Sequence, residues 1–258
     1  MTASAPQFRF DLEWRITLAT LLLVPLFISL GFWQLERAGE KVRLAGAWEQ
    51  RRQLPAADLD TLDGLPGDQL AYRNVRLRGE FLAGTQFLLD YRILQGRYGH
   101  EVITPLREAD SGRLVLVNRG WGPADPGRRT LPDAPPPEGL VTVAGHVYVP
   151  PGEPYLLNDQ VEEDGWPRRI QAVQVPALER ALASAPGEPN PDLFPYTVRI
   201  DNGEPGAQAV DWQVVNVSPA KHRGYAVQWF AMALALALIF LFRNSNLGAV
   251  LAGLWRRK

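Results

Sequence analysis

The sequence predicts a membrane protein of the α+β class, with two transmembrane helices forming a helical hairpin. The hairpin flanks a mostly antiparallel β-barrel or sandwich-like extramembrane domain with one or two short helices. Two uncharged, mostly apolar stretches, residues 16–35 and 224–242, predict the two transmembrane helices. At about 1.5 Å rise per residue, each stretch reaches roughly 30 Å, the thickness of a bilayer's hydrocarbon core. The more polar residues between them, 36–223, predict the folded domain.

Short segments rich in β-branched and aromatic residues, separated by Gly and Pro, predict the strands of this domain. One helix is predicted over residues 176–184, because Pro176 suits a first turn and Pro186-Gly187 ends the segment. Residues 51–70 read as a linker or a short irregular region. The predicted strands are residues 72–81, 86–94, 100–106, 114–121, 140–149, 169–175, 196–200 and 212–217.

Residues 122–139 contain six prolines and cannot extend a central strand, because proline offers no N–H to a strand ladder. We expect an exposed loop. It is either a surface for a partner or a connector between two halves of the sheet, and its loop-like composition favours the connector.

Composition excludes several classes of function. The net charge of -1 provides no basic surface, so no nucleic-acid partner is expected. The absence of cysteine rules out disulfides, thiolate catalysis, iron–sulfur clusters and Cys-ligated zinc or copper.

Lysine and arginine near the helix ends predict the membrane orientation, and the two helices disagree. The tail after the second helix, residues 243–258, carries four basic side chains and no acidic one, which favours the cytoplasm. The basic residues that follow the first helix favour the opposite orientation. Because long loops translocate largely regardless of charge, the short tail decides. Residues 1–15 and 243–258 are therefore predicted to be cytoplasmic, with the domain of residues 36–223 on the other side.

The flanks of the first helix indicate the type of membrane. A cleaved signal peptide is disfavoured, because residues 16–35 exceed the usual apolar core and charged residues follow where a small-residue cleavage site would lie. A mitochondrial presequence is disfavoured as well, because residues 1–15 contain Asp11 and Glu13. The prediction is a multi-pass protein of the bacterial cytoplasmic (inner) membrane, with a periplasmic domain.

No enzyme motif is present, and no catalytic residue is predicted. The sequence lacks G-x-S-x-G, the phosphate-binding G-x-x-x-x-G-K-[ST] and G-x-G-x-x-G. His100 and His146 lie in or beside strand segments, where hydrogen-bonded structural histidines are expected. The chain is therefore not expected to be an enzyme.

His222 stands at the start of the second transmembrane helix and is a candidate haem ligand. On a helix, His222, Tyr225, Ala226 and Trp229 share one face. Small Ala226 and the two aromatic rings would let a flat porphyrin approach the imidazole, a common axial ligand to haem iron. The alternative is a hydrated histidine at the membrane interface, where Tyr and Trp concentrate in any case.

At the end of the first helix, Trp33 and Arg37 lie one helical turn apart, at the same predicted membrane face as His222. Arg37 either pairs with a haem propionate or extends to the interface while stacking on Trp33. Gly31 in the same helix would permit close helix packing.

Three strings spread along the chain together resemble the Surfeit-locus family of cytochrome c oxidase assembly proteins. They are Gly31-Phe-Trp-Gln-Leu-Glu-Arg37 with Lys41; Val115-Leu-Val-Asn-Arg-Gly-Trp121, preceded by Gly99-His-Glu-Val-Ile-Thr-Pro105; and His222-x-x-Tyr225-Ala226-x-x-Trp229-Phe230. They occur in the family's order, between two membrane helices in the family's places.

The resemblance implies a non-enzymatic assembly factor that assists haem a handling or insertion into the large haem-bearing subunit of cytochrome c oxidase. A haem a synthase is a further expected partner. The family's proposed histidine ligand corresponds to His222, while Ala-Lys-His-Arg departs from the usual sequence there and puts a supporting hydrogen bond to His222 in doubt. Within the segment Asn118-Arg119-Gly120-Trp121, Gly120 is expected to supply a positive φ or a close approach. The alternative function is a structural scaffold that holds an oxidase intermediate without binding haem.

Overall fold

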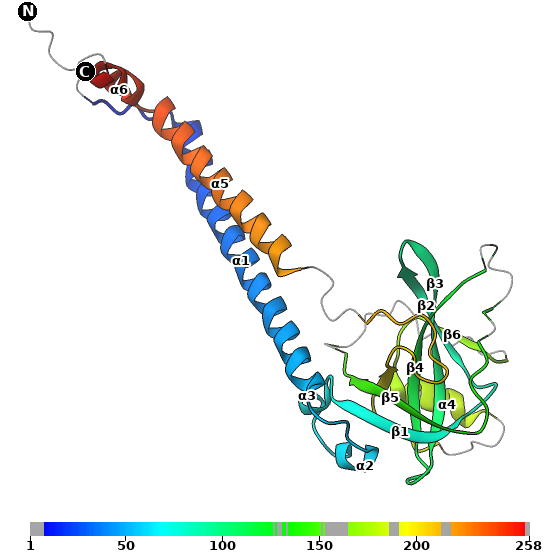
Figure 1. The fold of residues 1–258 in the computed structure, drawn as a ribbon. Coiled ribbons are helices and arrows are strands. Elements are labelled where there is room, and N and C mark those ends of the chain that lie inside the picture. The colour runs from blue at the N-terminus through cyan, green and yellow to red at the C-terminus, as the bar shows by residue number, and fades with distance from the viewer. Residues whose placement is uncertain are drawn as a thin grey trace, which may run out of the picture. The chain divides into compact units, whose positions relative to one another are not determined.

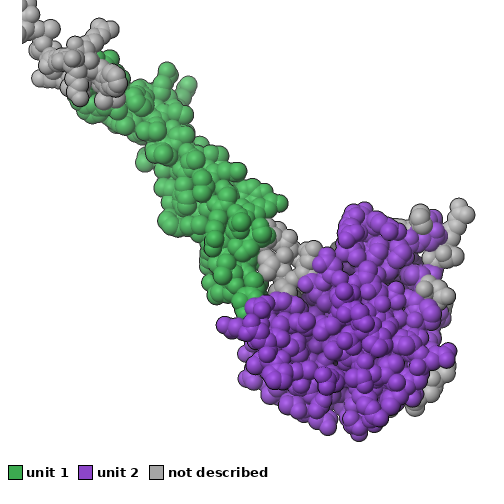
Figure 2. Space-filling view, viewed as in Figure 1, with its two compact units in different colours: residues 1–47, 214–258 green, residues 48–213 purple. Residues whose placement is uncertain are grey.

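The computed structural model describes residues 8–125, 127, 131–132, 134–150, 152, 165–185, 191–212 and 218–255. The chain divides into two compact units, coloured separately in Figure 2. One consists of Met1–Ala47 with Val214–Lys258, and the other of Trp48–Gln213.

The first unit is built on two long helices, α1 (Trp14–Arg52) and α5 (Pro219–Arg243), which lie side by side in Figure 1. Both are long and apolar enough to cross a membrane. α1 continues well beyond the apolar window, because the residues after it are mostly Ala, Leu, Glu, Lys and Arg, which are good helix formers. A short apolar helix, α6 (Leu247–Trp255), follows α5.

Small residues line the contact between α1 and α5. Ala226 and Ala233 of α5 are buried and lie seven residues apart, the spacing at which residues of a helix face a partner helix. Gly31 of α1 is also buried, and a β carbon there would lie 2.5 Å from Cε1 of Phe230. The close packing predicted at Gly31 is thus confirmed.

The second unit is a β domain in which five strands close into a barrel. The sheet order is β1-β5-β7-β4-β3-β2-β6, and an additional antiparallel pairing of β1 with β3 completes the ring. Most pairs are antiparallel, while β6 joins β2 and β7 joins β4 in parallel. The predicted α+β class with a mostly antiparallel barrel is therefore confirmed. The strands are β1 (Asn74–Phe81), β2 (Phe87–Leu94), β3 (Arg97–Glu108), β4 (Leu114–Pro123), β5 (Leu140–Tyr148), β6 (Arg168–Ile170) and β7 (Thr197–Ile200).

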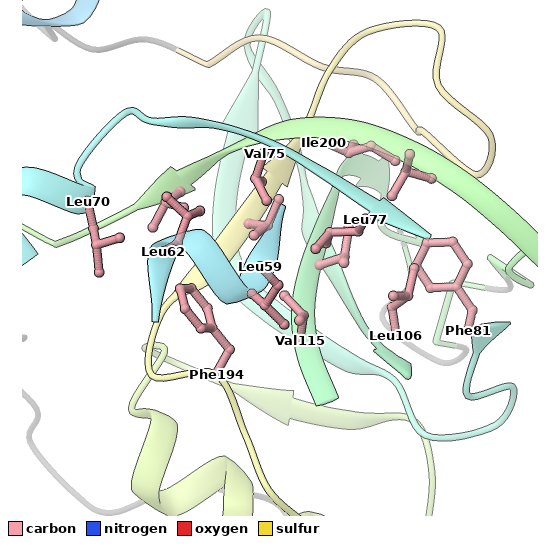
Figure 3. Close-up of a cluster of buried hydrophobic side chains, with 14 residues drawn as sticks. Leu59, Leu62, Leu70, Val75, Leu77, Phe81, Leu106, Val115, Phe194 and Ile200 are labelled. Atoms are coloured by element: carbon pink, nitrogen blue, oxygen red, sulfur yellow. The ribbon is translucent and has the colours of Figure 1, made fainter. Parts of the chain in front are cut away.

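The core of the barrel follows from alternating patterns such as that of β1, whose side chains are alternately buried and exposed. Two short helices, α2 (Leu59–Leu62) and α3 (Gly67–Leu70), add their leucines to this core (Figure 3). Residues 51–70, predicted as a linker or a short irregular region, therefore include two short helices that belong to the core. These helices are too short to show a helical period in the sequence, yet their leucines close one part of the barrel.

The predicted helix at residues 176–184 is confirmed as α4 (Val175–Ala183), whose Leu178 and Leu182 pack in a second core cluster with Phe87. The predicted strand at 169–175 is only partly correct, since β6 ends at Ile170. Val175 instead begins α4, because Pro176 favours a first helical turn. The strand predicted at 212–217 lies almost wholly outside the described residues.

The proline-rich segment connects β4 to β5, as predicted, but it is not exposed throughout. Ala134 is 8% exposed, and its carbonyl oxygen accepts hydrogen bonds from Gln86 and Arg119. The prediction of a wholly exposed loop is wrong, because two buried polar side chains of the barrel find their acceptor in this segment.

Candidate functional site

His222 lies in the first turns of α5, where Ser218 caps the helix by accepting the N–H of Lys221 and Pro219 occupies the first turn. The side chain is half-buried, and its Nδ1 lies 2.8 Å from Oε1 of Gln34 on α1. An amide oxygen can only accept, so Nδ1 is the donor of this bond, and the neutral form of the ring then carries its lone pair on Nε2. In the described part of the chain, no hydrogen bond uses Nε2. The arrangement leaves one imidazole nitrogen ready to bind a metal.

Gln34 thus supplies the supporting hydrogen bond that the sequence around His222 put in doubt. The bond crosses between residues 34 and 222, so nothing in the local sequence of α5 could reveal it. The only signal was the position of Gln34 inside the family string at the end of the first apolar stretch.

The other predicted site residues on α5 divide between the helix contact and the outer surface. Ala226 is buried, and the Trp229 ring packs on Phe27 of α1 with 5.6 Å between centroids. Tyr225 is 41% exposed. The residues predicted to share one face therefore differ in exposure, and Tyr225 is the more accessible of the two aromatic rings.

Trp33 and Arg37 are exposed on α1, one turn apart. The Arg37 guanidinium lies over the Trp33 ring, 5.9 Å from its centroid, and forms an ion pair of 2.7 Å with Glu40. The stacking expected as one alternative is present. An exposed ion pair of this kind contributes little stability, so Arg37 can exchange Glu40 for another carboxylate at small cost.

The family string on β4 contains a buried cation with no carboxylate partner among the described residues. Arg119 is 1% exposed, and burial lowers the pKa of its guanidinium to about 10. Its nitrogens donate to the carbonyls of Gly206, Ala134 and Pro135 at 2.7–3.0 Å. Arg119 therefore holds two loops against the barrel wall, a structural role that the sequence did not reveal.

Gly120 has the two properties predicted for it. Its φ is +104°, and a β carbon there would lie 2.7 Å from the carbonyl oxygen of Ala209. This close approach lets Trp121 exchange two backbone hydrogen bonds with Ala209, at 2.8 and 3.1 Å. Beside it, Asn118 accepts the Gly120 N–H and donates to Glu101 at 2.6 Å.

The two histidines of the barrel are buried beside carboxylates, as expected for structural histidines, but in the part of the chain that the structure describes the expected hydrogen bond is not formed at Nδ1 of either ring. Nδ1 of His100 lies 3.2 Å from Asp90, and Nδ1 of His146 lies 3.7 Å from Asp201. Asp201 is also bound by Arg52 at 2.9 Å. Among the described residues, no three His, Asp or Glu side chains are grouped to hold a metal ion.

His146 predicts a pH dependence of stability. Burial lowers the pKa of its imidazole, aided by Arg199 and Arg52 and opposed by Asp201. Below an unfolded-state pKa of about 6.5, the unfolded chain takes up a proton that the folded chain resists. The free energy of unfolding should therefore fall between pH 7 and pH 5. Thermal unfolding of the wild type and a His146→Phe variant tests this, and the variant should show the weaker dependence.

Asp201 does not produce the same effect in this pH range. Burial would raise its pKa, but the nearby His146 imidazole and the hydrogen bonds from the Arg52 guanidinium outweigh burial and lower it. Stability from this lowered pKa is present above an unfolded-state value of about 3.9 and is lost only at lower pH. Equal slopes for the wild type and His146→Phe between pH 7 and 5 would contradict the assignment to His146.

Comparison with known proteins agrees with the strings on α1, β4 and α5. The model of the SURF1 family matches residues 21–234. A SURF1-like protein of Caenorhabditis briggsae is 27% identical over 260 residues, covering 90% of this chain and 76% of that protein. A SURF1-like protein of Rickettsia felis is 31% identical over 109 residues, covering 42% and 46%.

The chain is also similar to the cytochrome oxidase assembly protein SHY1 of Saccharomyces cerevisiae. The two are 31% identical over 111 residues, which cover 42% of this chain and 28% of the yeast protein. The family match begins within α1, covers the whole barrel and ends within α5. The chain belongs to the SURF1 family.

Proposed function

We propose that this protein is an assembly factor for cytochrome c oxidase, a haem–copper terminal oxidase, and that it assists the handling or insertion of haem a. The observation that carries the haem part of the proposal is the bond between His222 and Gln34, which leaves Nε2 of the imidazole as a free ligand. The assembly role is supported by family membership and by the similarity to the yeast assembly protein.

In this proposal haem a is a cargo and not a reactant, so the protein works without a catalytic step. His222 supplies the axial ligand to the iron, and Gln34 fixes the ring by accepting its Nδ1–H. Tyr225 and Trp229 provide aromatic surface beside the imidazole. Arg37, supported by Trp33, exchanges Glu40 for a propionate.

The proposed setting is the bacterial cytoplasmic membrane, with α1 and α5 crossing the bilayer, both termini in the cytoplasm and the β domain in the periplasm. The length and apolar character of both helices support the membrane location, and the basic C-terminal tail supports the orientation. The proposed partners are the large haem-bearing oxidase subunit and a haem a synthase.

The visible absorption spectrum of the detergent-purified protein, made in cells that synthesise haem a, tests the haem proposal. We expect a Soret band in the wild type and its loss in a folded His222→Ala variant. Gln34→Leu should retain the band but bind haem about 10- to 100-fold more weakly, because a lost supporting hydrogen bond has that effect on metal affinity. Exposed Gln228 on the same helix as His222 provides the matched control, Gln228→Leu.

A further variant of Gln34 separates the ligand role from a packing role. Gln34→Glu keeps an acceptor for Nδ1–H and makes the imidazole a stronger donor, so bound haem should have a lower reduction potential. A colourless wild type, even after haem a is supplied, would contradict haem handling and favour a structural scaffold for an oxidase intermediate. Two contacts favour that second function: the Trp229 ring packs on Phe27, and Arg37 forms an ion pair with Glu40. These two side chains, both proposed to contact haem, therefore already have partners within the chain.

A further inference from the structure

Arg199 on β7 belongs to a row of polar residues that lie side by side on neighbouring strands of the barrel. In the strand register it stands opposite His146 of β5 on one side and Asn118 of β4 on the other. His146 in turn stands opposite Asn74 of β1. Directly paired residues point to the same face of a sheet, so these four strands place four polar side chains next to one another.

The row continues over the next two strands through side-chain contacts. Asn118 donates to Oε2 of Glu101 on β3 at 2.6 Å, and Oε1 of Glu101 lies 3.5 Å from Nε of Arg92 on β2. A polar row on a barrel wall otherwise built from Val, Leu and Ile is costly to bury unless its members are paired.

Aromatic rings hold the Arg199 guanidinium in place. Its Cζ lies 3.6 Å from the centroid of Tyr148 and 4.8 Å from that of Trp212. Trp212 is itself fixed by the hydrogen bond from its Nε1 to the carbonyl of Ile200 at 2.7 Å. Stacking of this kind orients the plane of the guanidinium but uses none of its N–H donors.

Arg199 differs in this respect from Arg119 and Arg113. The donors of Arg119 reach three carbonyls, and Arg113 is paired with Asp63 and Asp192 at 2.8 and 3.2 Å. Among the described residues, the side chain of Arg199 makes no hydrogen bond or ion pair, and its buried Nε has no acceptor. The side chain is only half-buried, so a ligand can still reach it.

The charges around Arg199 indicate the charge of the missing partner. The nearby carboxylates already have cations of their own, because Asp201 binds Arg52 at 2.9 Å and Glu101 lies beside Arg92. One positive charge, that of Arg199, is left over. Burial lowers the pKa of its guanidinium, and the opposing effects of Tyr148 and Glu101 do not offset burial fully. An anion in contact with the guanidinium would therefore stabilise the charged form.

We propose that Arg199, with Tyr148 and Trp212 as its walls, forms a binding site for the carboxylate group of a ligand that has a flat or apolar body. A carboxylate matches the guanidinium edge with two parallel hydrogen bonds and supplies the single negative charge that the row lacks. The aromatic walls favour an apolar body next to that carboxylate. A small organic acid and a porphyrin propionate share this chemistry. The site does not depend on haem ligation by His222.

Two probes test the site on the full-length protein in a non-ionic detergent. Binding of hexanoate is measured by saturation-transfer NMR, with hexanol as the uncharged control. Binding of iron-free protoporphyrin IX is measured by its own fluorescence, with its dimethyl ester as the control. Because neither probe contains iron, failure of this site and failure of iron binding at His222 are distinguishable.

We expect at least one of the acids to bind saturably and its uncharged control to bind more weakly. Arg199→Gln should weaken binding of the acid by about tenfold or more, which is the usual effect of losing a hydrogen bond to a charged group. Arg76→Gln, at an exposed position of β1, should leave it unchanged. Binding of hexanoate would identify small acids as the source of the carboxylate, and binding of the porphyrin alone would identify its propionates.

Arg199→Lys protects the test against a variant that fails to fold. It keeps the charge but loses the planar pair of donors, so the acid should still bind several-fold more weakly than to the wild type. The proposal is overturned if neither acid binds the folded wild type, or if Arg199→Gln and Arg199→Lys bind both acids as tightly as the wild type does.

Discussion

Replacing Arg119 with methionine is expected to lower the free energy of unfolding of the β domain by about 3–5 kcal/mol. Methionine is apolar and shorter, so the carbonyls of Gly206 and Pro135 lose the donor that Arg119 provides, and the carbonyl of Ala134 keeps only the hydrogen bond from Gln86. Each unsatisfied buried carbonyl costs about 1–3 kcal/mol. Urea unfolding of the full-length protein, followed by near-UV circular dichroism, measures the change.

Two further variants show whether geometry or charge carries this stability. Arg119→Lys keeps the cation but cannot reach three carbonyls in different directions, so we expect it to lose most of the same free energy. Arg76→Met removes an exposed arginine from β1 and should change stability by no more than about 0.5 kcal/mol. If Arg119→Lys were as stable as the wild type, the three-way hydrogen bonding would not be the cause.

Gly120→Ala is expected to lower the free energy of unfolding by about 2–4 kcal/mol, because a positive φ and a close contact act together. The φ of +104° disfavours any side chain, and the new β carbon would press on the carbonyl oxygen of Ala209 at 2.7 Å. That oxygen already accepts the N–H of Trp121 at 2.8 Å, so it cannot move without breaking the pair.

Gly122→Ala, two residues along the same strand, is the matched control. A β carbon at Gly122 meets Cγ2 of Val102 at 4.0 Å, an ordinary van der Waals distance. The φ angle of Gly122 is not positive, so an alanine there is not strained by the backbone conformation. The same urea titration should show a change within about 0.5 kcal/mol, and equal losses for Gly120→Ala and Gly122→Ala would show that the backbone of Gly120 is not special.

The sequence predicts those parts of the fold that depend on local patterns. Seven of the eight predicted strands have a counterpart in β1–β7, and Pro176 marks the start of α4 closely. Gly31 and Gly120 were identified because only glycine tolerates close approach or positive φ, a property of the residue itself. The leucines of α2 and α3 were missed, because a helix of four residues leaves no helical period to detect.

The chemistry of the candidate sites depends on contacts between distant residues, which local patterns do not encode. In the sequence, Gln34 stands out only as a member of the family string Gly31–Arg37. Its hydrogen bond to His222 joins two helices that are far apart in the chain. Arg199 is a single basic residue in a short strand, and no local sequence pattern marks it as part of a binding site. Its significance comes from the register that sets it between His146 and Asn118 and from the rings of Tyr148 and Trp212.

The position of β7 has a consequence for the protein during its synthesis. Among the strands of the described residues, β7 is the last to be made, yet it lies between β5 and β4 in the sheet. Until the ribosome has passed Ile200, β4 and β5 therefore lack their shared neighbour, and each presents unpaired backbone groups of the kind that promote aggregation. A chain that stops before Thr197 should thus be a substrate for chaperones and proteases and not a smaller working domain.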